Sequence, residues 1–140
     1  MPELAAEQQR SRLAAARVAR LATLRADGTP RLVPMTFVLV EGLICSAVDV
    51  VKAKRSTRLA RLADVARDPR VGLVVDHYDD DWSQLWWVRV DGTAAVHRSG
   101  ALRDRALAAL VAKYEPYAAA PPDGDVLVVT PQRWSGWVAR

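Results

Sequence analysis

The chain has 140 residues, of which 51% are hydrophobic and 26% charged, and a formal net charge of +4. These values are typical of one globular domain, so we treat residues 1–140 as a single domain. No apolar run approaches the roughly 18 residues of a membrane-spanning helix, and the N-terminal segment lacks the apolar core of a signal peptide. We therefore expect a cytoplasmic protein with no membrane association and an anionic partner.

The first third of the chain predicts a helix followed by antiparallel strands. Residues 3–17 are rich in Ala, Gln and Arg, which favours a helix. The following segments are rich in Val, Leu and Thr, and an Asp-Gly and a Glu-Gly dipeptide suited to hairpin turns divide them. They predict three consecutive strands, at 18–26, 30–40 and 43–48. Pro34 cannot donate a hydrogen bond to a neighbouring strand, so the middle strand should be bulged there or lie at an edge.

The central third predicts a helix, a buried strand and a second hairpin. The helix begins near Ser56, a good N-cap, and ends before Pro69, because the residue before a proline disfavours helix. Residues 70–78 contain an unbroken apolar run at 71–75, which predicts a strand buried on both faces. Two further strands are expected around an Asp-Gly turn, at 85–90 and 93–98.

The last third predicts an amphipathic helix at 101–113, a Pro-rich surface loop at 115–125 and a final strand at 126–138. The chain is thus mainly β with flanking helices (α+β). Consecutive hairpins with two or three inserted helices predict a small, closed or nearly closed antiparallel barrel of six or seven strands.

Side-chain catalysis by an acid–base group or a metal is weakly supported. The two histidines, His77 and His97, lie in separate segments, and no G-x-S-x-G motif occurs. No cluster has the spacing of metal ligands, so we expect no metal. The single cysteine, Cys45, sits among apolar residues and is interpreted as a packed core thiol. The acidic run 79–81 is interpreted as a solvated loop.

A basic cluster precedes and enters the central helix. Lys52, Lys54 and Arg55 stand at its N-terminus, where the helix already presents partial positive charge, so the cluster indicates a bound anion. Arg58 and Arg61 follow. The alternative is a solvated basic face. Specific DNA binding is not expected, because the helix is followed by a strand and not by a recognition helix.

A pair of tryptophans lies in the predicted strand 85–90. Trp86 and Trp87 are adjacent, so their side chains point to opposite faces of a sheet, one to the core and one to a groove or interface. The latter could hold the ring of an organic cofactor whose phosphate or carboxylate the basic cluster binds.

The ordered set of segments "DGTPRLVPMTFVLVEGLICSAVD", "KAKRSTRLARLADVARDPRVGLVVDHYDDDW" and "LWWVRVDGTAAV" resembles the split β-barrel family of pyridoxamine 5'-phosphate oxidase, with an FMN-binding-like fold. The similarity is greatest to the actinobacterial branch of probable F420-dependent enzymes. The resemblance implies a homodimer with two cofactor sites in the subunit interface.

Carried over by position, the resemblance implies a set of cofactor-binding residues. The cofactor phosphate would contact Lys52, Lys54 and Arg55, with Arg58 or Arg61 assisting. The ring would be lined by Pro34, Met35, Thr36, Ser46, Ala47, Val48 and Trp87. Trp87 stands where FMN oxidases of the family have a glutamine, and this loss of polar groups favours F420 over FMN.

The resemblance implies an F420-dependent oxidoreductase that transfers hydride from the reduced deazaflavin to a conjugated or heteroaromatic small molecule. Two alternatives stay open: an FMN-binding oxidoreductase of the same fold, and a non-catalytic carrier of a flavin or F420. The proton donor is also open, between water and a residue such as His77, Tyr78 or Ser46. We expect small-molecule partners and no nucleic acid.

Overall fold

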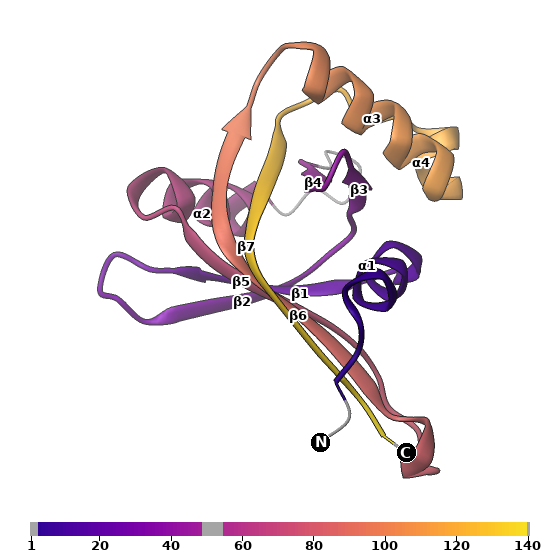
Figure 1. Cartoon of the computed structure of the whole chain (residues 1–140). Helices are drawn as coiled ribbons and strands as arrows, with labels where there is room; N and C mark the ends of the chain where they lie inside the picture. The colour runs from indigo at the N-terminus through magenta and orange to yellow at the C-terminus, as the bar shows by residue number, and fades with distance from the viewer. Residues whose placement is uncertain (1–2, 49–54, 140) are drawn as a thin grey trace.

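The computed structural model of the chain describes residues 3–48 and 55–139, and for residues 55–59 it describes the backbone alone. The helices are α1 (Ala6–Ala15), α2 (Arg55–Arg67), α3 (Ala101–Lys113) and α4 (Glu115–Ala119), with a short 3-10 turn, η2 (Trp82–Gln84). The strands are β1 (Ala19–Leu24), β2 (Pro30–Met35), β3 (Val38–Val40), β4 (Leu43–Ala47), β5 (Arg70–His77), β6 (Trp86–His97) and β7 (Val126–Val138). Figure 1 shows their arrangement.

The strands form one antiparallel sheet in the order β2-β1-β5-β6-β7-β4-β3. The long strands β6 and β7 run side by side through the middle of the molecule and join its two ends (Figure 1). Among the described residues the sheet keeps two edges, β2 and β3, so it is a split half-barrel. The prediction of a mainly β fold with flanking helices is confirmed, whereas the closed form of the barrel is not observed.

Two turns were predicted correctly from their glycines. Gly28 and Gly42 have φ of +84° and +80°, which residues with a side chain rarely adopt. The expected strand 30–40 is divided into β2 and β3 by a bend at Thr36 and Phe37. Pro34 lies on the edge strand β2, as its missing donor required.

The predicted hairpin at Asp91-Gly92 was wrong, because β6 continues through it without a turn. β7 pairs with β6 along its whole length, and the register shifts where Asp91 faces Arg133 and Gly92 faces Pro131. The extra residue, Gln132, forms a bulge in β7. Two smaller expectations also fail: the Pro-rich loop contains helix α4, and β5 alternates between buried and half-buried residues.

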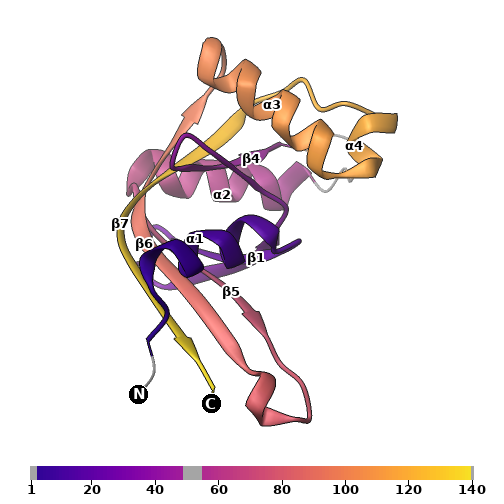
Figure 2. The ribbon, with the colours of Figure 1, turned by 45° about the vertical axis from the view of Figure 1, so that its right-hand side comes forward.

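The main core lies on one face of the sheet, which we call the inner face. It contains side chains from six strands, including Leu21, Met35, Ile44, Leu73, Val75, Val88, Val90, Leu127 and Val129. Leu13 of α1 and Val65 of α2 belong to the same core, and Figure 2 shows both helices on the concave side of β6 and β7. α3 packs instead on the opposite, outer face, at the β4 end, over Cys45 and Val128.

Helix α2 is fixed to β1 and β2 through a buried carboxylate. Asp64 is 3% exposed and accepts hydrogen bonds from Thr23 Oγ1 at 2.7 Å, Arg31 Nε at 2.6 Å and Arg67 at 3.0 Å. Burial opposes ionisation of this group, but the three donors outweigh burial and lower its pKa to about 2. The position of α2 beside the sheet therefore depends on one ionised side chain as well as on apolar packing.

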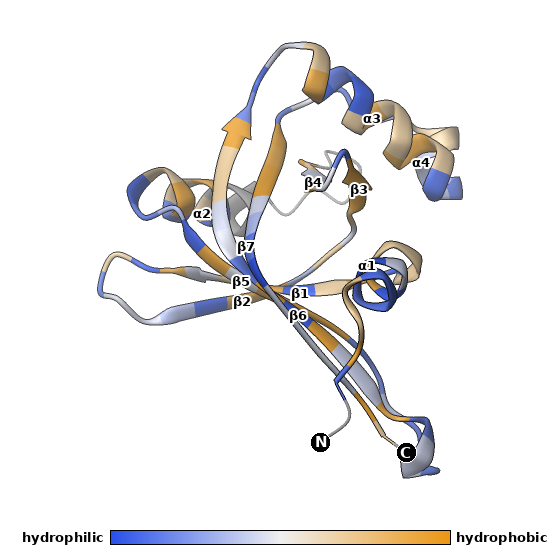
Figure 3. Cartoon of the chain, viewed as in Figure 1, coloured by the Kyte–Doolittle hydropathy of each residue, from blue (hydrophilic) through white to orange (hydrophobic). Residues whose placement is uncertain are grey.

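The tip of the β5–β6 hairpin is hydrophilic (Figure 3). Asp79, Asp80 and Asp81 are all exposed there, which confirms the solvated acidic loop. Within the described ranges, no helix is long and apolar enough to cross a membrane.

Candidate functional site

The residues predicted to line a cofactor ring lie mostly at one corner of the sheet, where β2 and β4 end. Thr36 Oγ1 and Tyr117 Oη are 2.9 Å apart, and Tyr117 packs in the same cluster as Ala47. Tyr117 of α4 therefore joins the two predicted segments. Sequence reasoning missed this residue, because its partner Thr36 lies 81 positions away.

The other predicted members of this corner differ in orientation. Met35 is buried in the main core and Ser46 is 4% exposed on the inner face, two residues after Ile44. Val48 donates its backbone N–H to Asp125 O at 2.9 Å. Pro34 is exposed and precedes the inner-facing Met35, so it lies on the outer face, apart from the rest.

The predicted phosphate-binding residues are only partly described. Lys52 and Lys54 lie outside the described residues, and the side chains of Arg55 and Arg58 are not described. Arg61 is half-buried on α2. The helix itself begins at Arg55, eight positions after the last residue of β4, and its first turn contains no acidic residue. The N–H groups of its first turn, which have no acceptor within the helix, thus lie close in sequence to the ring-lining corner.

A cavity of about 470 Å³ lies between α2 and the second half of β6. Its walls are mostly small and apolar: Leu62, Ala63, Val65, Ala66, Ala94, Ala95 and Val96, with Arg98 and Asp125 at one side. The Arg98 guanidinium is 3.5 Å from the Asp125 carboxylate. Because Asp125 also binds the Val48 amide, this cavity adjoins the end of β4.

Trp87 lies on the outer face of the sheet, opposite Trp137 on β7. The Arg89 guanidinium lies 5.1 Å from the centre of the Trp87 ring. Two neighbouring polar atoms, Ser135 Oγ and Trp137 Nε1, are buried without a hydrogen-bond partner among the described residues. Trp86 turns inward and packs on the main core, so the prediction that the two tryptophans face opposite ways is confirmed.

Within one chain the sheet separates Trp87 from Ser46. Trp87 alternates with the inner-facing Val88, whereas Ser46 alternates from Ile44 on the same side as the core. The predicted ring-binding residues therefore do not converge in a single chain.

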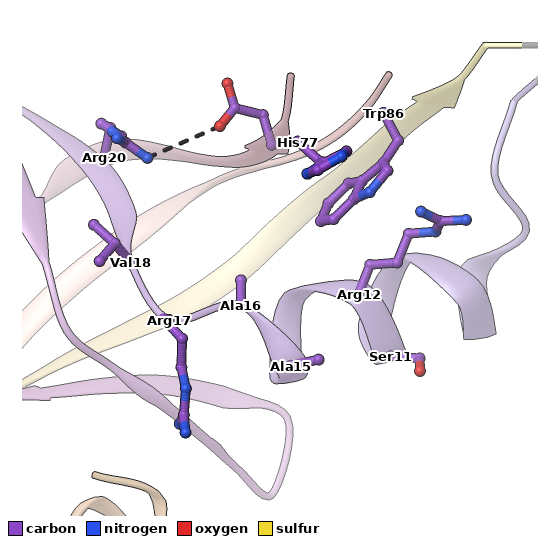
Figure 4. A pocket seen from close by; sticks show the side chains of 10 residues that line it. Ser11, Arg12, Ala15, Ala16, Arg17, Val18, Arg20, His77 and Trp86 are labelled. Atoms are coloured by element: carbon purple, nitrogen blue, oxygen red, sulfur yellow. Dashed lines mark ion pairs between the residues drawn. The ribbon is translucent and has the colours of Figure 1, made fainter. Parts of the chain in front are cut away.

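A second pocket, of about 400 Å³, lies between α1 and the ends of β1, β5 and β6. Figure 4 shows Trp86 and His77 side by side at one end of it, with Arg12 beneath the indole at 4.9 Å from the ring centre. Arg20 reaches Asp76 at 3.9 Å, and Arg17 points away from the pocket. No predicted cofactor residue lines this pocket, although His77, one of the open proton donors, does.

The structure also places the other residues that were considered as reactive groups or metal ligands. Cys45 is fully buried, and burial raises the pKa of its thiol to about 11, as expected for a packed core thiol. The part of the chain that the structure describes contains no group of three or more His, Cys, Asp or Glu side chains that could hold a metal ion. Tyr78, another open proton donor, is 70% exposed at the hairpin tip.

Several solved structures share this fold. A conserved hypothetical protein of Mycobacterium tuberculosis superposes with a TM-score of 0.78 at 19% identity, over 98% of this chain and 86% of that one. A FAD-binding protein of Mycobacterium smegmatis superposes with a TM-score of 0.67 at 21% identity, over 99% of both chains. A heme-binding protein of the same organism superposes with a TM-score of 0.76 at 24% identity, over 99% of this chain and 56% of that one.

No curated protein sequence matches the chain. The sequence profile of the family described as pyridoxamine 5'-phosphate oxidase, in contrast, matches residues 5–138. That match covers nearly the whole domain, including every strand of the half-barrel. The chain belongs to the pyridoxamine 5'-phosphate oxidase family.

Proposed function

We propose that this protein is an oxidoreductase that binds a flavin-like cofactor, with F420 as the preferred one, and reduces a conjugated or heteroaromatic small molecule. The observation that carries the proposal is the junction of β4 with α2. Small residues, Ser46 and Ala47, end the strand, and a helix with no acid in its first turn follows after a basic segment. Family membership supports the same reading.

The residues present fit such a cofactor in two respects. A phosphate requires amide donors and cations, and the N-terminus of α2 with Lys52, Lys54 and Arg55 supplies both types. A planar ring requires a flat wall, and Trp87 offers a half-buried indole. Ser135 Oγ and Trp137 Nε1 beside it, which have no hydrogen-bond partner among the described residues, are polar groups that a bound molecule or a second subunit can engage.

When bound, a cofactor of this class carries the hydride, so the protein needs few catalytic side chains. The corner residues Met35, Thr36 and Ser46 would position the ring and exclude water. The Tyr117 hydroxyl, 2.9 Å from Thr36 Oγ1, would hold that side chain in place. A cofactor that carries the hydride is consistent with the described part of the chain, where no cluster of acid–base side chains was found.

We further propose a homodimer with the cofactor sites between subunits. α1 and α2 contact the inner face of the sheet and α3 covers only its β4 end, which leaves Leu32 on β2 71% exposed. Trp87 and Ser46 face opposite sides of their own sheet, so a site that uses both needs a second copy. Together these features support an interface over the outer face.

The choice of F420 rests on the aromatic pair in "WWVR", where polar contacts to FMN would otherwise be expected. A flavin is the second candidate, because structurally similar proteins from Mycobacterium smegmatis and Mesorhizobium loti are described as FAD-binding. A non-catalytic carrier of the same cofactor is the third.

A titration of the purified protein with F420, FMN and FAD, followed by cofactor and Trp fluorescence, tests the proposal. We expect saturable F420 binding that weakens by about 1 to 3 kcal/mol in Lys52→Ala/Lys54→Ala, the usual strength of charged hydrogen bonds. Arg70→Ala/Arg105→Ala, which removes the same charge from exposed positions away from the proposed site and interface, is the matched control.

The outcomes separate the candidates. Tighter binding of FMN or FAD would move the protein to the flavin branch. Tight binding of F420 without turnover of any acceptor in a varied panel would identify a carrier. Saturation with none of the three cofactors would leave the basic segment as a solvated surface and end the proposal.

A further inference from the structure

Lys113 ends helix α3 and is the only lysine in the part of the chain that the structure describes. Its ammonium lies against the bend between β2 and β3. Nζ donates to Phe37 O at 2.9 Å and lies 4.0 Å from the centre of the Phe37 ring and 5.2 Å from that of Tyr114. The half-buried ammonium is thus held in one position, and one of its three N–H groups is used.

Arg17 brings a second cation to the same place. Its guanidinium donates to the Lys113 carbonyl oxygen at 2.8 Å and lies 5.4 Å from the centre of the Tyr114 ring. The two cations therefore share one aromatic ring. Arg17 also lines the pocket beside α1, but Figure 4 shows its side chain directed away from Arg12 and Trp86.

Among the described residues, no carboxylate forms an ion pair with either cation. Burial, and to a smaller extent the charge of Arg17, lower the pKa of Lys113 to about 8. The C-terminus of α3 favours both cations, since Arg17 donates to its last carbonyl, but a helix end supplies only partial negative charge and no full counterion for the two.

We propose that Lys113 and Arg17 together bind an anionic group, a carboxylate or a phosphate, of a small molecule at the bend between β2 and β3. The Lys113 ammonium contacts Phe37, the residue after Thr36, so the bound group adjoins the ring-lining corner. The anion site stands on this geometry alone. Its assignment to an acidic substituent of the acceptor rests on the proposed function.

Residue-resolved NMR of the uniformly ¹⁵N-labelled chain, without cofactor, tests the site. Sodium phosphate and sodium cinnamate, a conjugated carboxylate, are each titrated at pH 7 while the Phe37 and Tyr114 amide signals are followed. We expect saturable shifts at both amides. Lys113→Gln should weaken binding about tenfold or more, the effect of losing a charged hydrogen bond, whereas Arg12→Gln, on the neighbouring pocket, should leave it unchanged.

The pH dependence distinguishes binding from a merely structural lysine. The charged and titratable groups that the structure brings onto Lys113 are Arg17 and Tyr114, and burial raises the pKa of the Tyr114 hydroxyl above its ordinary value. Affinity in the unmodified protein should fall as the pH rises above about 8. Lys113→Arg should retain binding and lose this dependence, since a guanidinium stays charged.

Two results would overturn the site: no saturable shift at Phe37 and Tyr114 with either anion, or equal affinities in the unmodified protein and a folded Lys113→Gln. Anion binding in a protein that binds no F420 or flavin would sustain the site and reject the proposed function. Cofactor binding without anion binding would reject the anion site and leave the proposed function intact.

Discussion

Asp64 Oδ2 lies 2.6 Å from Arg31 Nε, although the two residues are 33 positions apart. The contact joins α2 to the edge strand β2, and Thr23 Oγ1 on β1 binds the same oxygen. The helix that opens beside the proposed cofactor site is therefore placed by a buried polar network and not by apolar packing alone. Such a network stabilises only while every member has its partner.

Replacement of Asp64 by alanine should destabilise the fold. The change leaves Thr23 and Arg31 without their acceptor, and we expect a loss of about 2 to 4 kcal/mol, below the range for a fully buried pair because Arg31 is 25% exposed. Urea denaturation measures it. Asp68→Ala is the control, since its partner Arg70 is 74% exposed, and it should change stability much less. Equal effects of the two changes would contradict the role given to Asp64.

The same carboxylate makes the stability of the fold depend on pH in the acidic range. The folded pKa of Asp64 is about 2, below its ordinary 3.8, so its stabilisation is complete above the ordinary value and is lost as the pH falls toward 2. The stability difference between the unmodified protein and Asp64→Asn should therefore shrink over that window. A difference that stays constant from pH 5 to the onset of acid unfolding would show that Asp64 is not ionised at pH 5.

Lys113 should also make stability rise with pH, but in an alkaline window and because the fold disfavours its charged form. Its folded pKa of about 8 lies below the ordinary 10.5, so between these values the unfolded chain binds more protons and stability rises with pH. Lys113→Met removes this titration. From pH 8 to 10 we expect the free energy of unfolding of the unmodified protein to rise relative to that of Lys113→Met. Urea denaturation at several pH values measures both. Parallel curves would mean that Lys113 keeps its ordinary pKa.

Some of these features follow from local sequence and others do not. The turns at Gly28 and Gly42 were predictable, because each needs a backbone with positive φ, which glycine adopts readily. The Asp91-Gly92 dipeptide carries the same local signal, but pairing with β7 along all of β6 overrides it. Tertiary pairing, which a local pattern does not contain, decided the outcome there.

The candidate site shows the same division. The basic segment and the small residues of β4 are readable in the sequence, because charge and size are properties of single residues. Tyr117 and Lys113 were missed as site residues, because their contacts with Thr36 and Phe37 span 81 and 76 positions. Only the fold brings α3 and α4 against the bend between β2 and β3.

Gly92 should tolerate no side chain. A Cβ there would lie 2.2 Å from the Thr130 carbonyl oxygen, at the bulge that lets β7 follow β6. Backbone must shift, so Gly92→Ala should cost about 1 to 3 kcal/mol, the usual effect of overpacking. At Gly72 on the adjacent strand the nearest atom would be 3.5 Å away, an ordinary contact. Gly72→Ala is the control, and denaturation midpoints that fall equally in both variants would refute the steric explanation.

Cys45 should be inert in the folded protein. It is fully buried, and burial raises its thiol pKa to about 11, so almost no thiolate is present at neutral pH. We expect a disulfide reagent to modify it only at the rate at which the fold opens, faster in submolar urea. Rapid stoichiometric labelling without denaturant would contradict this packing.

The proposed two-chain site leads to a complementation experiment. If the basic segment of one subunit and Trp87 of the other form each cofactor site, then a Lys52→Ala/Lys54→Ala chain and a Trp87→Ala chain are each defective in both sites. After unfolding and refolding together, half of the dimers are mixed, and each mixed dimer has one site with both parts intact. Roughly a quarter of the normal sites should return.

Cofactor binding by the mixed sample measures this recovery, with each variant refolded alone as the control. Sites built within one chain would give no recovery, because every site would then carry one of the two lesions. Since Trp87 and Ser46 face opposite sides of their own sheet, we expect recovery. The stoichiometry of bound cofactor in the mixture thus tests whether the basic segment and Trp87 of one site come from different subunits.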